Sequence, residues 1–139
     1  MKKIFYALVI ALSVSVLSSC AGSNKNKMAI LQTVVEATKG HTPMTVADGI
    51  VMTDVYLDSD YFTYVYDCDD EKFDVDQIEA NMERSKADIK ASLAIQHDTM
   101  AVLLELLKES GIGIAYKYVG TPSGKTSFIY LESNELPIF

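Results

Sequence analysis

The side chains that could bind a metal ion gather in one acidic segment, Asp67–Asp76 (DCDDEKFDVD). Alternate positions at its start carry oxygen ligands, as in a calcium-binding EF-hand loop: Asp67, Asp69 and Glu71. Such a loop also needs glycine at its sixth position and glutamate at its twelfth, where this chain has Lys72 and Ile78. We therefore expect a solvated acidic loop and no metal or cofactor, with a looser calcium site as the alternative.

Histidine and cysteine are scarce, and their spacing does not describe a catalytic centre. His41 and His97 lie far apart, without a cysteine or carboxylate at the spacing of zinc ligands. Cys68 stands between two aspartates, whose charge raises the pKa of a thiol and makes it less nucleophilic. We expect a buried, inert thiol, with an intermolecular disulfide or a catalytic thiol as alternatives. No serine has the context of a nucleophile elbow, so the chain is not expected to be an enzyme.

The other cysteine, Cys20, ends a segment typical of protein export. Ile4–Leu17 is an apolar run that follows two lysines. It is shorter than the roughly 20 residues that span a bilayer, but it suits a signal peptide. The motif Leu17-Ser18-Ser19-Cys20 resembles the lipobox of bacterial lipoproteins. This resemblance implies diacylglycerol transfer to the Cys20 thiol, cleavage that removes residues 1–19, and anchoring by acyl chains such as palmitate. An ordinary cleaved signal or an anchor helix are the alternatives.

The residues after Cys20 indicate a destination in the cell envelope. Ala21 is not the aspartate that retains lipoproteins in the inner membrane of enteric bacteria, and this analogy favours the outer membrane. Gly22–Lys27 (GSNKNK) is small and polar, so residues 20–27 are expected to form a lipidated, flexible tether before a single domain over 28–139. An acidic sorting run is missing there, which favours the periplasmic face.

The charge of the mature chain excludes some partners. Removing residues 1–19 takes away two of the 12 basic residues and none of the 19 acidic ones, so the net charge changes from −7 to −9. Phosphate backbones and anionic head groups repel such a chain, so nucleic acid binding is not expected. No second apolar segment approaches spanning length, so we expect the membrane to be reached through the lipid on Cys20. The remaining 120 residues suffice for one domain.

Hydrophobic periodicity predicts an α+β fold. A short helix over 28–39 and a brief extended edge over 44–46 precede a hairpin of strands 50–57 and 61–67. The stretch 76–110 lacks glycine and proline and is expected to form two helices that break within 94–98, capped by Asp76 and Asp98. A second hairpin pairs 112–119 with 126–131. We predict two layers: an antiparallel sheet of two hairpins, with the helical pair packed on one face.

Strand alternation separates a core face from an undecided face. A turn centred on Asp58-Ser59 would pair Val55 with Phe62, Thr53 with Tyr64 and Val51 with Tyr66. In the second hairpin, the residues that look like core are Ile114, Tyr116, Tyr118, Ile129 and Leu131. Phe62 is also expected in the core. The less decided faces carry four aromatic residues that we predict to form a partner surface: Tyr56, Tyr61, Phe128 and Tyr130.

Several short motifs occur in a characteristic order along most of the mature chain: Pro43-x-x-Val46, Thr53-x-Val55, Tyr64-x-Tyr66, Leu106 to Gly111, Tyr116-x-Tyr118 and Gly124-Lys125. This succession resembles a group of small exported bacterial proteins of unknown function. The motifs are structural, so the resemblance implies no activity. We expect a lipid-anchored, non-catalytic binding or accessory module for an envelope protein. The alternative is a periplasmic carrier of a small ligand or divalent metal, with a pocket between sheet and helices.

Overall fold

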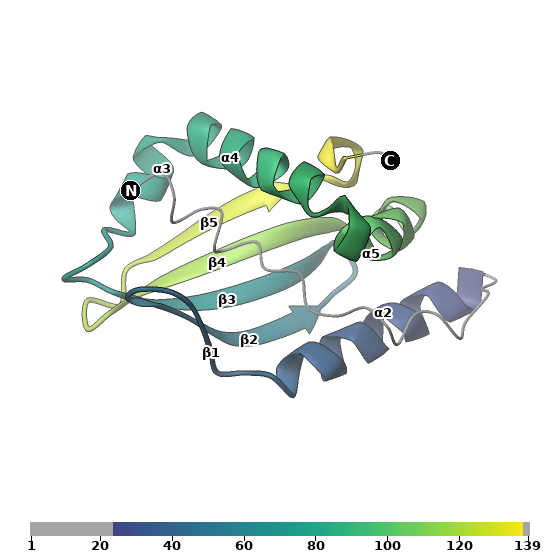
Figure 1. The fold of residues 1–139 in the computed structure, drawn as a ribbon, viewed down its shortest axis with the longest axis horizontal. Coiled ribbons are helices and arrows are strands. Elements are labelled where there is room, and N and C mark those ends of the chain that lie inside the picture. Colours follow the sequence, from purple (N-terminus) through teal and green to yellow (C-terminus); the bar gives the residue numbers. More distant parts are fainter. Residues whose placement is uncertain (1–23, 138–139) are drawn as a thin grey trace.

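The computed structural model describes residues 24–137, apart from the side chains of 24–26 and 97–99, so Cys20 and the predicted signal lie outside it. The elements follow one another as α2 (Asn24–Lys39), β1 (Met44–Ala47), β2 (Ile50–Leu57), β3 (Tyr61–Asp69), α3 (Asp76–Ala80), α4 (Met82–Ile95), α5 (His97–Glu109), β4 (Gly113–Thr121), β5 (Thr126–Leu131) and the short 3-10 helix η2 (Ser133–Glu135) (Figure 1). Among the described residues, no helix combines the length and apolarity needed to cross a membrane.

Five strands form one sheet in the order β1-β2-β3-β4-β5, and both predicted hairpins are present. The hairpins are joined along β3 and β4, which run parallel from Tyr61 beside Gly113 to Asp69 beside Thr121. A parallel pair needs a long crossover, and helices α3 to α5 supply it. The predicted α+β fold with helices on a largely antiparallel sheet is confirmed. The parallel junction at its centre was not predicted.

The predicted register of the first hairpin is wrong, because its turn is centred one residue later, on Ser59 and Asp60, where the N–H group of Asp58 donates to the carbonyl of Tyr61 at 3.1 Å. Phe62 pairs with Leu57, and Tyr64 pairs with Val55. The carboxylate of Asp58 accepts the backbone N–H groups of Asp60 and Tyr61, at 2.8 Å each, and stabilises this turn. A register shift between Met52 and Asp54 then inserts an extra residue into β2, as in a β-bulge.

This bulge decides which residues of β2 face the core. Strict alternation would put Ile50 and Met52 on the face opposite to Val55. With the extra residue, all three side chains are buried, at 0%, 1% and 0% exposure. The same core contains the predicted inward side chains of the second hairpin, from Ile114 to Leu131. The bulge therefore lets β2 contribute three large apolar residues to one face of the sheet.

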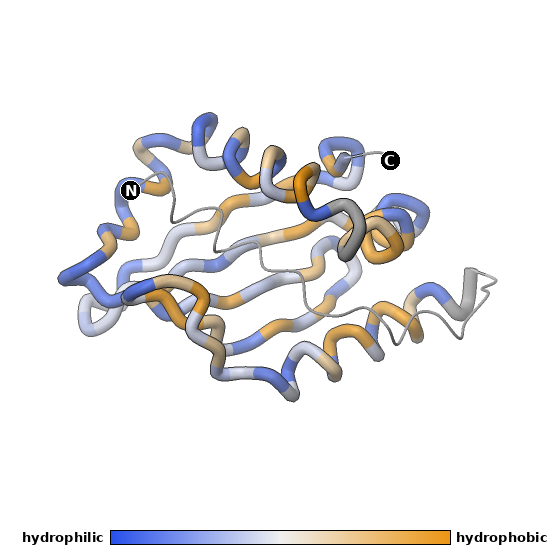
Figure 2. The backbone as a smooth tube through the Cα atoms, viewed as in Figure 1, coloured by the Kyte–Doolittle hydropathy of each residue, from blue (hydrophilic) through white to orange (hydrophobic). Residues whose placement is uncertain are grey.

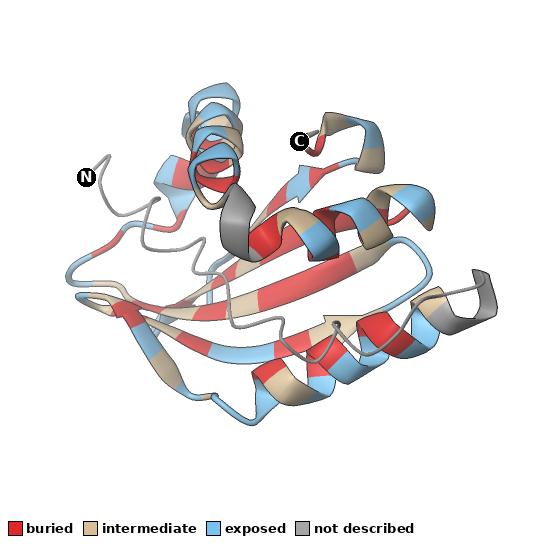
Figure 3. Ribbon diagram, turned by 45° about the vertical axis from the view of Figure 1, so that its right-hand side comes forward, coloured by how far each residue is buried: buried red, intermediate tan, exposed pale blue. Residues whose placement is uncertain are grey.

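The helices cover this one face of the sheet (Figures 1 and 3). Their buried side chains form a single cluster with the inward sheet residues, and the stripes lie at helical spacing: Ile30, Leu31, Val34 and Val35 in α2, Ile78 in α3, Ile89 and Leu93 in α4, and Met100, Leu103, Leu104 and Leu107 in α5. Hydrophobic and hydrophilic positions alternate along these helices as that packing requires (Figure 2).

The helix boundaries confirm the predicted break within 94–98 and correct the two predicted N-caps, Asp76 and Asp98. A break separates α4 from α5 at Gln96, within the predicted 94–98. The prediction of two helices is incomplete, because a second break at Asn81 divides the first of them into α3 and α4. Asp76 does not cap α3, because it is already the first helical residue; the carboxylate of Asp74 accepts its N–H group at 3.0 Å instead. Helix α5 likewise begins at His97, one residue before the predicted cap Asp98. Gly111 follows α5 with a φ of 69°, a left-handed conformation that favours glycine.

Candidate interaction surface

The face of the sheet turned away from the helices carries the candidate surface, and we call it the open face. Within the described chain no element packs on it. Its side chains come from positions that alternate with the buried ones, and most are half-buried or exposed: Val51, Asp54, Tyr56, Tyr61, Val65, Lys117, Val119, Phe128 and Tyr130. The structure therefore places all four predicted surface aromatics on the open face.

Three of these aromatics form one cluster, which we call the aromatic cluster: Tyr61, Phe128 and Tyr130. The ring centroids of Tyr61 and Tyr130 are 4.9 Å apart with planes tilted by 49°. Phe128 and Tyr130 lie nearly parallel, at 6°, with centroids 5.4 Å apart. These separations are within the range of favourable aromatic pairs. Tyr56 lies apart on β2, in the same cross-strand row as Thr63, Ala115 and Tyr130.

Small residues on β4 allow the cluster to form. Tyr61 lies on β3 and Tyr130 on β5, and strands two positions apart are separated by about 10 Å. Their rings meet because the intervening strand presents only Gly113 and Ala115 between them. A Cβ atom on Gly113 would lie 3.1 Å from two ring carbons of Tyr61. Ala115 is 1% exposed although it lies on the open face, as expected for a small residue between larger neighbours.

A carboxylate holds the ring of Tyr61 in place. The hydroxyl of Tyr61 donates a short hydrogen bond to Glu132, which follows β5. This hydrogen bond, with smaller contributions from desolvation and the Glu132 charge, raises the pKa of Tyr61 to about 12. The phenol therefore stays neutral and remains a donor at physiological pH. At the other side of the cluster, Lys117 Nζ lies 5.8 Å from the centroid of the Phe128 ring, a cation–π contact of about 0.5–1 kcal/mol.

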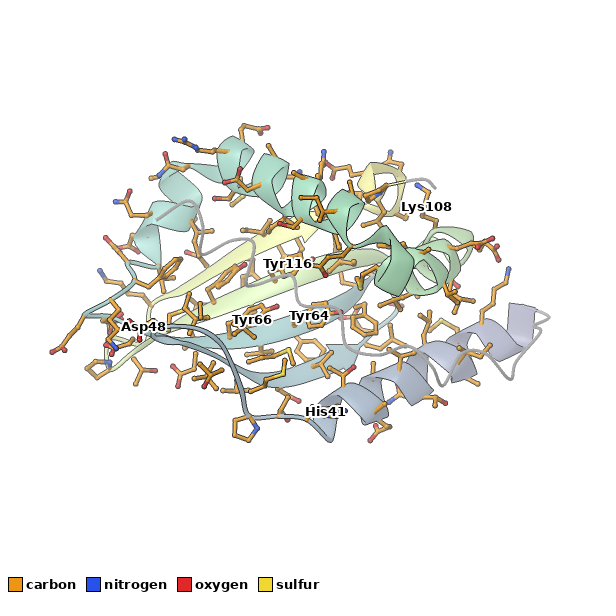
Figure 4. The ribbon with its side chains drawn as sticks, viewed as in Figure 1. His41, Asp48, Tyr64, Tyr66, Lys108 and Tyr116 are labelled. Atoms are coloured by element: carbon orange, nitrogen blue, oxygen red, sulfur yellow. The ribbon has the colours of Figure 1, made fainter. Side chains whose placement is uncertain are left out.

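The aromatics of the opposite face are core, as predicted for Phe62, Tyr116 and Tyr118, which are 0–1% exposed. Tyr64 and Tyr66 join them, and Figure 4 shows both near Tyr116 in the middle of the sheet. The rings of Tyr64 and Tyr116 stack at 5.7 Å, and those of Tyr66 and Tyr118 at 5.3 Å. Burial raises the pKa of all four tyrosines well above 10. None of these phenols is poised to transfer a proton.

The acidic segment lies at the end of the sheet where β3 and β4 finish, and its carboxylates are engaged locally. Asp70 accepts the backbone N–H group of Ser123 at 2.7 Å and its hydroxyl at 2.9 Å. Asp76 pairs with Lys125 Nζ at 2.8 Å. Two solvent-open hollows flank this end, of about 590 Å³ beside Asp70 and Ser123 and about 350 Å³ beside Gly49. Among the described residues, no three acidic, histidine or cysteine side chains group as metal ligands.

The remaining candidates for chemistry are placed away from the aromatic cluster. Cys68 is completely buried as a free thiol. Burial, assisted by the charges of Asp67 and Asp70, raises its pKa to about 12, so it is a poor nucleophile at neutral pH. His41 is exposed just past the end of α2, and its backbone N–H group donates to the carbonyl of Thr38 at 3.0 Å.

Three further residues contribute to this surface and were not included in the predicted partner surface: Gly113, Lys117 and Glu132. The sequence does contain a signal for the first, since Gly113 and Ala115 are small residues at alternate positions of a strand that otherwise presents large ones. Their importance depends on which strands flank β4, however, and the parallel pairing with β3 was not predicted. Glu132 is 71 residues from Tyr61 in the sequence, so the pair emerges only in the folded chain.

Comparisons with known proteins identify the fold and no more. No family model matches the chain, and no curated protein matches it. A solved structure of a Pseudomonas aeruginosa protein, described as a "putative secreted protein", superimposes with a TM-score of 0.64. The superposition covers 84% of this chain and 98% of that chain, at 9% sequence identity. This chain therefore shares its α+β fold with that protein.

Proposed function

We propose that the protein is an exported, lipid-anchored and non-catalytic module that binds an envelope protein through the open face. Export is supported by the predicted signal segment and by the fold shared with a protein described as secreted. The lipobox-like motif before Cys20 supports the anchor, Ala21 supports the outer membrane, and the lack of an acidic run after Cys20 supports its periplasmic face.

The observation that carries the binding role is the aromatic cluster on a sheet face with no described element upon it. Tyr130 is 41% exposed, which is unusual for a large aromatic in a sheet whose other face is fully packed. Tyrosine and phenylalanine provide a large apolar area with few rotatable bonds, so ordering them costs little on binding. Lys117 and Glu132 stand at either side of the cluster and would add polar contacts at the rim of an interface.

A non-catalytic role is supported by the state of the groups that could perform chemistry. The one described thiol is buried with a raised pKa, and the core phenols are buried and neutral. The carboxylates of Asp70 and Asp76 are occupied by Ser123 and Lys125.

Photocrosslinking in cells tests the proposal. A photoreactive benzoylphenylalanine at position 56 lies on the open face but outside the aromatic cluster, so it reports a partner without removing the proposed contacts. We expect one dominant crosslinked protein, identified by mass spectrometry. The double substitution Phe128→Ser and Tyr130→Ser should abolish this crosslink and leave the circular dichroism spectrum unchanged.

A matched control replaces exposed apolar residues on the helical layer. Ile95 and Val102 are 73% and 48% exposed, so the double variant Ile95→Ser and Val102→Ser removes comparable surface elsewhere. It should crosslink like the unmodified protein. Equal crosslinking by both double variants would contradict the proposal. A melting temperature raised by calcium would instead favour the alternative of a divalent-metal carrier.

A further inference from the structure

We infer that the domain stands on the membrane by one defined end, so that its acidic end points away from the lipid. The anchor end consists of the start of α2, the end of α5 and the β2–β3 turn (58–60). The acidic end consists of residues 67–76 and the β4–β5 turn (122–125). This orientation rests on the proposed lipidation of Cys20.

The length of chain between the lipid and the domain is the first reason. Helix α2 begins at Asn24, inside the segment expected to be a tether. Only four residue steps separate Cys20 from Asn24, and a fully extended chain covers at most about 14 Å over them. Whatever conformation those residues adopt, a lipid on Cys20 holds the start of α2 within that distance of the membrane surface.

The start of α2 is fastened to the domain, so it cannot swing away independently. Lys27 Nζ forms an ion pair with Glu109 at the end of α5, at 2.6 Å, and the Lys27 side chain is only 17% exposed. One turn further along, Ile30 and Leu31 are 5% and 0% exposed in the core. Because α2 is packed into the domain, a short tether at its start limits the orientations that the whole domain can adopt relative to the membrane.

Three other segments lie at the same end of the molecule as the start of α2: the end of α5, the start of β4 and the β2–β3 turn. Glu109 precedes Gly113 by four residues, and the N–H group of Gly113 donates to the carbonyl of Asp60 in the β2–β3 turn at 3.0 Å. Figure 1 shows the start of α2 and the end of α5 at the same, right-hand end, opposite the β4–β5 turn. The β2–β3 turn is therefore expected close to the lipid.

The acidic end, at the opposite side of the domain, is suited to contact with water. Strand β3 extends for nine residues, about 30 Å, before it reaches the acidic segment. That segment is strongly hydrophilic (Figure 2) and carries four carboxylates within six positions: Asp69, Asp70, Glu71 and Asp74. Anionic head groups repel such a cluster within about 8 Å at physiological ionic strength. The anchor end also carries two exposed carboxylates in its turn, Asp58 and Asp60, so the orientation rests on the tether length.

The orientation defines the kind of partner that the open face fits. Tyr61 pairs with Gly113 and Tyr130 with Ala115, at the start of β4, so the aromatic cluster lies toward the anchor end. A short tether holds it beside the bilayer, where a protein embedded in or attached to the same membrane is within reach. We therefore assign the cluster to a membrane-held protein partner.

A matched pair of labels tests the orientation on the full acylated protein. Ser59→Cys places a thiol in the exposed β2–β3 turn, and Glu71→Cys places one in the exposed acidic segment. Cys68 is completely buried, so the introduced thiols take the fluorescent label selectively. Each labelled protein is reconstituted into vesicles of phosphatidylethanolamine and phosphatidylglycerol that contain a nitroxide-bearing lipid as quencher. With the labels about 30 Å apart, we expect quenching at position 59 to exceed that at position 71 at least about threefold.

The outcomes separate this orientation from the proposed function. Equal or reversed quenching in acylated protein would overturn the orientation and leave the anchor intact. Absence of acyl mass on Cys20, with no flotation of the protein with vesicles, would overturn the proposed anchor and the orientation together. Insertion of about 20 glycine and serine residues after Ser23 should bring the quenching ratio close to one, because such a linker spans about 25 Å on average. An unchanged ratio would overturn the role of the tether.

Discussion

The two faces of the sheet place the same residue types in different environments. The face under the helices carries Phe62, Tyr64, Tyr66, Tyr116 and Tyr118, all at most 5% exposed. The open face carries Tyr56, Tyr61, Phe128 and Tyr130, none of which is fully buried. On the inner face, rings stack along and between β3 and β4 and are covered by α2 to α5. On the open face, three rings gather over two small residues of β4.

The two faces differ most clearly in the hydrogen bonding of their tyrosine hydroxyls. On the inner face, the hydroxyls of Tyr116 and Tyr118 are buried and have no hydrogen-bond partner within the described part of the chain. On the open face, the hydroxyl of Tyr61 donates to Glu132. Tyr116 and Tyr118 therefore contribute through ring burial, at a cost for their hydroxyls. Tyr61, on the open face, is oriented by its hydroxyl, and its ring is available for contact.

The largest expected effect compares one phenylalanine from each face. Phe62→Ala should lower the free energy of unfolding by about 3–5 kcal/mol, because it leaves a cavity under the helices. Phe128→Ala should lower it by about 1–2 kcal/mol, because the half-buried ring loses its contacts with Tyr130 and Lys117 but leaves no cavity under the helices. Urea denaturation followed by circular dichroism measures both values. Similar losses for the two variants would show that the open face is covered, and would remove the basis for a binding surface.

A smaller effect, of opposite sign on the two faces, is expected when single hydroxyls are removed. Tyr118→Phe should raise the free energy of unfolding by about 1 kcal/mol, since it deletes a buried hydroxyl that lacks a partner. Tyr61→Phe should lower it by about 0.5 kcal/mol, because it breaks the hydrogen bond to Glu132. Thermal and urea denaturation of both variants test the contrast. Destabilisation by Tyr118→Phe would mean that its hydroxyl is satisfied.

The smallest effect concerns the alkaline titration of the Tyr61 phenol on the open face. Hydrogen bonding to Glu132 raises the pKa of Tyr61 to about 12, so Glu132→Gln should lower that pKa toward 10. Because the folded-state pKa is the higher one, the contribution to stability is complete below about pH 10 and is lost as the pH rises through about 12. Ultraviolet absorbance of phenolate, with Tyr61→Phe identifying the Tyr61 step, measures the titration. An unchanged curve in Glu132→Gln would show that another group perturbs Tyr61.

Short-range patterns predicted much of the fold. Alternation in residues 112–131 identified the inward side chains of the second hairpin, and the length of the stretch without glycine and proline predicted the break between α4 and α5. The bulge at Met52–Asp54 was missed because one extra residue leaves no distinctive local pattern, yet it moves every later side chain to the other face. The prediction that Asp76 caps α3 was wrong, because several aspartates precede the helix and the pattern does not distinguish them: Val75 occupies the cap position without a side-chain hydrogen bond, and Asp74 accepts the N–H group of Asp76.

The candidate surface shows the same division between local and distant information. Its four aromatics could be selected from the sequence because they fall at alternating positions of strands whose other positions are apolar. Their grouping could not be predicted, because Tyr61 and Tyr130 belong to different hairpins. Which strands flank β4 depends on the direction in which the α3–α5 crossover returns the chain, and local residue patterns do not encode it.

By itself, the sequence determined the secondary structure elements, the acidic charge and an expected point of lipid attachment at Cys20. Each of these depends on residues that are neighbours in the chain or on composition alone. The tertiary structure decided which aromatics are buried, that Tyr61 meets Tyr130 over Gly113, and that the start of α2 lies beside the end of α5. The physical reason is that burial and pairing depend on segments brought together by the parallel β3–β4 junction, whose two strands are separated in the sequence by all of α3 to α5.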